Sequence, residues 1–198
     1  MNCRRPCLVW LVLAVALAVL ASGCAKHEAA QQRLDCPGLD GGKPVDPVLL
    51  AFLSRARAAH HLADQYEEQE EPAGAIAALE KLVRGPVPGG ESPPPEAREV
   101  LSDTRARLAD LESQLGRFDD AAEDVDEGLK LAPEPSYYQG HLFEVRGLLE
   151  DRRSKALAKS GKTDQAKQAR ERALQAFEKS MRVQAGVIKK AVPDAGSP

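Results

Sequence analysis

Aromatic residues and residues that favour β-strands are scarce in this sequence. Aromatic residues make up 4% of the 198 residues, and the one tryptophan, Trp10, lies near the start of the chain. No segment is rich in Val, Ile and Thr, which are enriched in strands. Alanine and leucine supply most of the apolar surface instead, and both favour helices. The composition therefore predicts an all-α fold.

The sequence after residue 24 also lacks the short motifs that carry cofactor chemistry. It has no glycine-rich phosphate loop, no CxxC pair, and no HExxH or GxSxG motif. Acidic and basic residues alternate along it with a small acidic excess, whereas nucleic acid binding needs a clustered basic face. We therefore expect a non-enzymatic protein with no cofactor and no nucleic acid partner.

The first 23 residues have the pattern of a secretory signal peptide. Arg4 and Arg5 are followed by an uninterrupted apolar segment, Leu8 to Leu20. As a helix this segment is about 20 Å long, which is too short for a hydrocarbon core of about 30 Å. A basic start, a short apolar segment and small residues after it are typical of an export signal that is cleaved.

The end of this segment, Leu20-Ala21-Ser22-Gly23-Cys24, resembles the lipobox of bacterial lipoproteins. The resemblance implies cleavage before Cys24, a diacylglyceryl group on its thiol and usually a third acyl chain on the new amino terminus. Two or more acyl chains hold a protein stably at a bilayer, because each buried CH₂ contributes about 0.8 kcal/mol. A soluble secreted protein and an uncleaved membrane helix are the alternatives.

The residue after the cysteine bears on location. In Gram-negative lipoproteins an Asp at this place implies retention at the inner membrane, and here the residue is Ala25. The resemblance therefore implies an outer-membrane lipoprotein whose folded part faces the periplasm.

Residues 24–47 are expected to form a flexible tether between the lipid and a folded domain. They contain Gly, Pro and Gln and have no helical apolar period. A flexible chain of this length has an end-to-end distance of about 25 Å. The tether contains Cys36, the one other cysteine left after processing. We expect it as an unpaired thiol, with an intermolecular disulfide as the alternative in an oxidising compartment.

From residue 48 onward, apolar residues recur every three or four positions, the period of a helix with one buried face. Breaks rich in Gly and Pro divide this region into antiparallel helix pairs at about 48–84, 96–132 and 137–190. The predicted apolar faces include Leu62, Leu115 and Leu174. Residues 191–198 are expected as a disordered tail. The folded domain is thus predicted over residues 48–190.

The middle pair resembles a tetratricopeptide repeat. Gly116 lies between its two helices, an aromatic residue follows two positions later, Ala121 follows three after that, and Pro133 comes after the second helix. Glycine tolerates the left-handed conformation of such a turn, and proline cannot continue a helix. The first pair has Glu70 at the glycine position, whereas the third pair keeps Gly161. The resemblance implies a short α-solenoid of stacked helix pairs.

The repeat length differs from that of the family. The equivalent alanines, Ala75, Ala121 and Ala166, are 46 and 45 residues apart, against about 34 in tetratricopeptide repeats. HEAT-like repeats have a period nearer 45 and are the rival architecture, and unrelated helical hairpins would give similar apolar stripes. The sequence leaves these alternatives open.

The resemblance also implies where a partner would bind. In tetratricopeptide arrays the exposed residues of each first helix line a groove. The equivalent positions in this sequence are His60, Asp64, Glu67, Asp103, Ala106, Asp110, Asp151 and Lys155. Most of these side chains are acidic, so we expect a groove that suits a basic peptide or loop of an envelope protein.

The segment from His60 to Glu68 supports a second hypothesis. His60, Asp64 and Glu67 lie at i, i+4 and i+7, hence on one face of a helix, and imidazole and carboxylate groups can bind divalent metals. A metal-binding or enzymatic lipoprotein is therefore the alternative function.

The favoured hypothesis is a membrane-anchored scaffold or adaptor that binds an envelope protein or peptide through its repeats. Self-association is a further expectation, because the last pair is left without a neighbour. Phe177, Met181 and Ile188 are the apolar residues that another molecule would cover there.

Overall fold

The computed structural model describes residues 46–192. These residues form six α-helices and no strand, which confirms the prediction of an all-α fold. The signal peptide, Cys24, Cys36, nearly all of the tether and the last six residues lie outside the described range. Among the described helices, none combines the length and the hydropathy that crossing a membrane requires.

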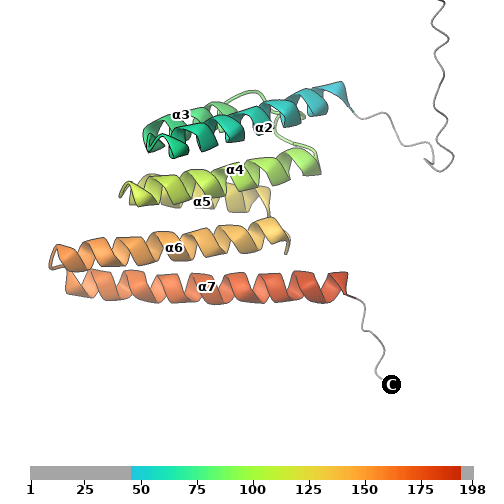
Figure 1. The fold of residues 1–198 in the computed structure, drawn as a ribbon. Coiled ribbons are helices and arrows are strands. Elements are labelled where there is room, and N and C mark those ends of the chain that lie inside the picture. The colour runs from blue at the N-terminus through green and yellow to red at the C-terminus, as the bar shows by residue number, and fades with distance from the viewer. Residues whose placement is uncertain (1–45, 193–198) are drawn as a thin grey trace, which may run out of the picture. The chain divides into compact units, whose positions relative to one another are not determined.

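The helices form three consecutive pairs (Figure 1). α2 (Pro47–Glu68) packs on α3 (Pro72–Val83), α4 (Pro95–Gln114) on α5 (Phe118–Leu131), and α6 (Tyr137–Lys159) on α7 (Thr163–Ala191). The pairs stack in chain order, because α4 contacts both helices of the first pair and α6 contacts both helices of the second. In Figure 1, α2, α4 and α6 lie one below the other, with α3 and α5 behind them. α7 contacts α6 and none of the other described helices.

Local sequence signals fix where several helices begin. Pro47, Pro72 and Pro95 each open a helix, where the missing N–H costs nothing and the fixed φ suits the first turn. The side chain of Asp46 accepts a hydrogen bond from the backbone N–H of Val48 at 2.8 Å. Ser136 caps α6 in the same way. Such caps stabilise a helix by about 1 kcal/mol.

The same turn joins the two helices of every pair. Glu70, Gly116 and Gly161 have φ values of 58°, 77° and 74°, so each is left-handed. In each turn the N–H of the next residue donates to the carbonyl five residues earlier, at 2.8 to 3.0 Å: Glu71 to Tyr66, Arg117 to Glu112 and Lys162 to Leu157. This bond closes a Schellman-type helix end. The first turn therefore has the backbone of the other two, although glutamate replaces the glycine.

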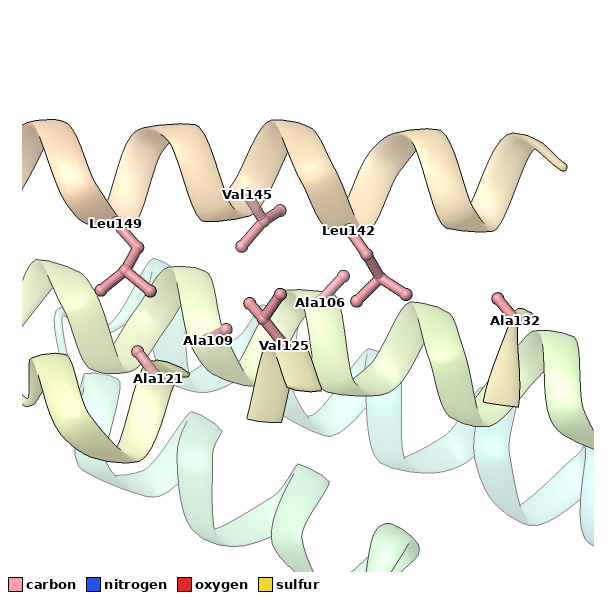
Figure 2. Packing of buried hydrophobic residues seen from close by; sticks show 8 residues of the cluster. All are labelled: Ala106, Ala109, Ala121, Val125, Ala132, Leu142, Val145 and Leu149. Atoms are coloured by element: carbon pink, nitrogen blue, oxygen red, sulfur yellow. The ribbon is translucent and has the colours of Figure 1, made fainter. Parts of the chain in front are cut away.

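Small side chains let the second and third pairs pack closely (Figure 2). Leu142, Val145 and Leu149 of α6 point toward α4 and α5, where they meet mostly alanines in a buried cluster. Gly128 of α5 also lies at this interface: a Cβ there would stand 2.6 Å from a methyl carbon of Leu142. Burying a Leu or Val side chain contributes about 1.5–3 kcal/mol, so this cluster is a principal source of stability.

Some predictions about single positions were wrong. Leu62, Leu115 and Leu174 are 47%, 47% and 57% exposed. Leu115 is the C-cap of α4, after the last residue of the helix. In α2, Ala63 is buried in place of its neighbour Leu62. Ala106, expected in an exposed groove, is fully buried among the residues that contact α6. A small residue suits that position because the two first helices approach closely there.

Candidate functional site

The residues predicted to line a groove lie along the first helices of the pairs. We call the following set the first-helix ridge: His60, Asp64, Glu67, Asp103, Arg107, Asp110, Asp151, Arg152 and Lys155. All belong to α2, α4 or α6 and are at least partly exposed. All the predicted residues therefore lie on the first helices, and of these only Ala106 is buried. The structure also adds two arginines that the sequence analysis did not include.

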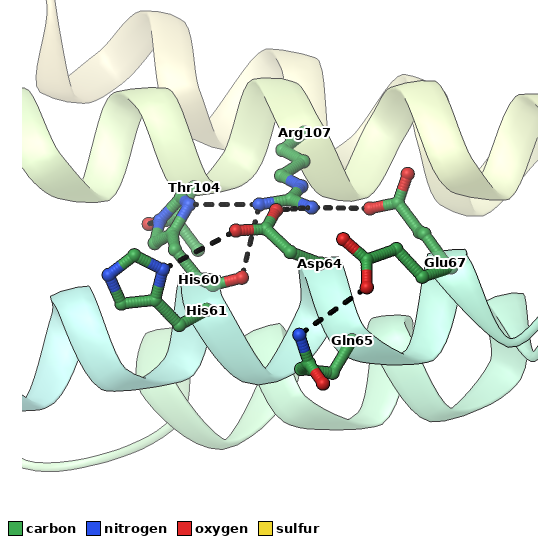
Figure 3. A network of polar contacts seen from close by, with 8 residues as sticks. His60, His61, Asp64, Gln65, Glu67, Thr104 and Arg107 are labelled. Carbon is green, nitrogen blue, oxygen red and sulfur yellow. Dashed lines mark hydrogen bonds and ion pairs between the residues drawn. The ribbon is translucent and has the colours of Figure 1, made fainter.

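His60 faces α4 rather than open solvent (Figure 3). Its Nε2 lies 2.9 Å from Oγ1 of Thr104, whose own hydroxyl donates to the carbonyl of Val100 at 2.7 Å. Thr104 therefore accepts from Nε2–H, which leaves Nδ1 to accept from Arg107 at 3.4 Å. Burial lowers the pKa of His60 below 6.5, although the charge of Asp103 opposes this. His60 is thus a neutral structural contact at pH 7.

The two carboxylates of the same segment converge on Arg107 (Figure 3). Its Nη2 donates to Oδ1 of Asp64 at 2.6 Å and also to the carboxylate of Glu67, while Nη1 donates to the carbonyl of His60. The hydrogen bond from Arg107 holds the pKa of Asp64 below its usual value. The guanidinium of Arg107 therefore occupies the position beside Asp64 and Glu67 where a metal ion would have to bind. No three metal-ligating side chains of the described part are placed to hold an ion, so the metal hypothesis gains no support from this geometry.

The next interface repeats the contact. Arg152 of α6 donates to Oδ1 of Asp110 at 2.7 Å and to Oγ of Ser113 at 2.6 Å. Arg152 follows Arg107 by 45 residues, and Asp110 and Ser113 follow Asp64 and Glu67 by 46. The two interfaces therefore use the same arginine contact at equivalent positions. This contact shows that the pairs are structural repeats with a period of 45–46 residues, as the alanine spacing predicted.

Both ends of the series lack this contact. The position 46 residues before Arg107 is His61, and the position 45 residues after Asp110 is Lys155. Lys155 pairs within its own helix, with Asp151 at 2.6 Å. The first repeat therefore has no arginine for a preceding repeat, and the last has a cation where an acceptor would be needed. The ridge is also less acidic than expected, because Arg107 and Arg152 neutralise part of its charge.

A second polar cluster lies inside the middle repeat, and the sequence analysis missed it. The side chain of Glu112 is buried, with Oε1 3.0 Å from Arg117 and Oε2 without a hydrogen-bond partner. Asp124 of α5 is also buried and pairs with Arg105. Burial, together with the nearby charge of Asp124, raises the pKa of Glu112 from 4.5 to about 8, against the opposing effect of Arg117. Glu112 is therefore largely protonated at neutral pH.

The burial of Glu112 could have been predicted from the sequence, because this polar residue lies within a stripe of apolar residues. It follows Leu108 by four residues and comes directly after Leu111, and both leucines are buried. A carboxyl at such a position must shift its protonation or find a partner, because burying an unpaired charge is costly.

Comparisons with models of protein families, with curated proteins and with solved structures gave no match to this chain.

Proposed function

We propose that this protein is a membrane-anchored, non-enzymatic scaffold that binds an envelope protein or peptide on the first-helix ridge. In this proposal the repeats are tetratricopeptide-like, and acylated Cys24 anchors the chain in the outer membrane, on the periplasmic side. The observation that carries the proposal is the arginine contact repeated between α2 and α4 and between α4 and α6. It joins the first helices into one continuous surface, and stacked repeats use such surfaces to bind other proteins.

The charge of the ridge narrows the chemistry of the partner. It carries five carboxylates and three permanent cations, the latter being Arg107, Arg152 and Lys155. Arg107 and Arg152 each form an ion pair with a carboxylate of the preceding repeat, so less of their positive charge is available to a partner. A small acidic excess remains. We therefore favour a partner segment with basic and neutral polar residues over an acidic one.

A site-specific cross-linking experiment tests the ridge. A photo-reactive amino acid replaces Asp103, which is partly exposed on α4, and, in a control, Lys130, which is exposed on α5 away from the ridge. The full chain is expressed in cells and irradiated, and the adducts are identified by mass spectrometry. We expect the same envelope protein to be captured from position 103 and not from position 130. Capture from both positions alike, or from neither, would refute the ridge as the binding surface.

The anchor is tested separately. Cys24→Ser removes the thiol that the lipobox resemblance assigns to acylation, and Cys36→Ser is the matched control in the same segment. We expect the first variant to leave the membrane fraction and the second to remain there. If the Cys24→Ser protein stays with membranes as the parent chain does, the anchor is elsewhere.

A further inference from the structure

The last helix carries a stripe of exposed apolar side chains. Leu174, Met181 and Ile188 follow one another at seven-residue intervals on α7 and are 57%, 65% and 62% exposed. Val192, at the end of the helix, is 59% exposed and continues the stripe. Leu174 and Val192 are about 27 Å apart along the axis. A contiguous apolar surface of this kind is typical of an interaction site.

The repeat pattern shows that this surface lies at the free end of the stack. Leu174 follows Leu129 of α5 by 45 residues. Leu129 packs against the buried cluster that contains Leu142 of α6, so position 174 is where a following pair would pack. α7 contacts only α6 among the described helices (Figure 1). Within residues 46–192, nothing covers the stripe.

Another repeat of the same kind does not fit there. In α5, Phe118 and Ala122 also pack against the cluster shared with α6. Their equivalents in α7, 45 residues later, are Thr163 and Lys167. The first part of α7 is therefore polar at the positions that would hold a fourth pair. The apolar stripe begins only at Leu174 and runs toward the C-terminal end of the helix.

The charges beside the stripe select a second copy in an antiparallel orientation. Glu171, Glu178, Arg182 and Lys189 are exposed, and at 3.6 residues per turn they lie along one flank of the stripe. The two acidic residues come first and the two basic ones last. In an antiparallel pair of α7 helices, Glu178 faces the partner's Arg182 and Glu171 faces the partner's Lys189. In a parallel pair this flank of one helix would lie on the opposite side of the interface from the same flank of its partner, so these opposite charges would not meet.

We propose that α7 pairs antiparallel with α7 of a second copy of this chain, around a two-fold axis near Met181. Met181 then faces the partner's Met181, and Leu174 faces the partner's Ile188. Such an interface is isologous and closes on itself, so it gives a dimer and not a fibre. The proposal goes beyond the scaffold function and does not depend on it, because the first-helix ridge belongs to other residues.

Cysteine cross-linking in the full chain tests the pairing. The parent has Cys3, Cys7 and Cys36 replaced by Ser, with Cys24 retained, and its cross-linked fraction with a short bismaleimide sets the background. We expect Met181→Cys to give a cross-linked dimer well above this background, and Leu174→Cys and Ile188→Cys alone to give none. Coexpressed Leu174→Cys and Ile188→Cys chains should cross-link to each other. A dimer from all three single variants would indicate a parallel pair, and no dimer from Met181→Cys would mean no pairing; either result overturns the proposal.

A charge exchange provides a second, independent measurement in the Met181→Cys background. Glu178→Arg and Arg182→Glu are each expected to lower the cross-linked fraction, because each sets like charges opposite each other. The double variant restores opposite charges and should restore cross-linking. Since both residues are exposed on α7, these changes should leave the helical circular dichroism spectrum unaltered. Equal cross-linking in all four proteins would refute the antiparallel register.

Discussion

The buried carboxyl of Glu112 should make the stability of this protein depend on pH in an unusual direction. Its pKa is raised from 4.5 to about 8 by burial and by the charge of Asp124. Between these two pH values, the unfolded chain has released the proton that the folded chain still holds. The free energy of unfolding therefore falls as the pH rises from about 4.5 to about 8. Most buried acids that are paired with cations have the opposite effect.

Glu112→Gln isolates this contribution. Glutamine has the shape of the protonated carboxyl, its oxygen can still accept from Arg117, and it does not titrate. At 1.36 kcal/mol for each tenfold change in proton affinity, the raised pKa corresponds to on the order of 3–5 kcal/mol. We expect the variant to match the wild type near pH 4.5 and to become more stable by roughly this amount by pH 8.5.

Urea unfolding of the full chain, followed by circular dichroism at several pH values between 4.5 and 8.5, measures the difference. The exposed Glu91→Gln change in the loop before α4 is the control for replacing a glutamate by glutamine. If the difference between Glu112→Gln and wild type is the same at pH 5 and pH 8.5, Glu112 titrates normally in the folded protein. A variant that is less stable than wild type throughout would show that the charged form of Glu112 is the one that stabilises the fold.

Two further predictions concern the turns and the contacts between repeats. Glu70 has a left-handed backbone with φ 58°, so Glu70→Gly should raise the free energy of unfolding by about 0.5–1 kcal/mol. Gly116→Ala should lower the free energy of unfolding by about 1 kcal/mol, because alanine is strained in the same conformation. Denaturant titration measures both effects, and a destabilised Glu70→Gly protein would contradict the reasoning. Arg107→Ala should cost about 1–2 kcal/mol, because Asp64 and Glu67 lose their shared donor while remaining partly solvated. Exposed Arg57→Ala on α2 is its control, and equal effects of the two changes would show that the contact between repeats adds nothing.

The sequence predicted the helix pairs and their turns because these depend on local chemistry. Glycine, proline and the period of apolar residues act over a few positions, and the positive φ of Gly116 and Gly161 follows from them. The equivalence of Glu70 to these glycines was also visible from spacing alone. Its left-handed backbone was not, because glutamate has no preference for that conformation.

The sequence did not predict all the residues of the first-helix ridge, because their pairing depends on contacts between residues that are distant in the sequence. Asp64 and Glu67 were interpreted as free acidic side chains, since their partner Arg107 is 40 or more positions away. The spacing of 45 residues between Arg107 and Arg152 equals that between Ala121 and Ala166, and this was a usable signal. Ala106 was misplaced because the register of one first helix against the next is a tertiary property.

The position of α7 at the edge of the stack has a consequence for how the chain unfolds. Because this helix contacts α6 alone among the described helices, its detachment in a single copy of the chain breaks one interface and leaves the other two pairs intact. Amide protons of α7 should therefore exchange faster than those of α4, which is held from both sides. Unfolding would then proceed inward from the C-terminal end as a series of partial openings, so that a single melting temperature describes the molecule poorly.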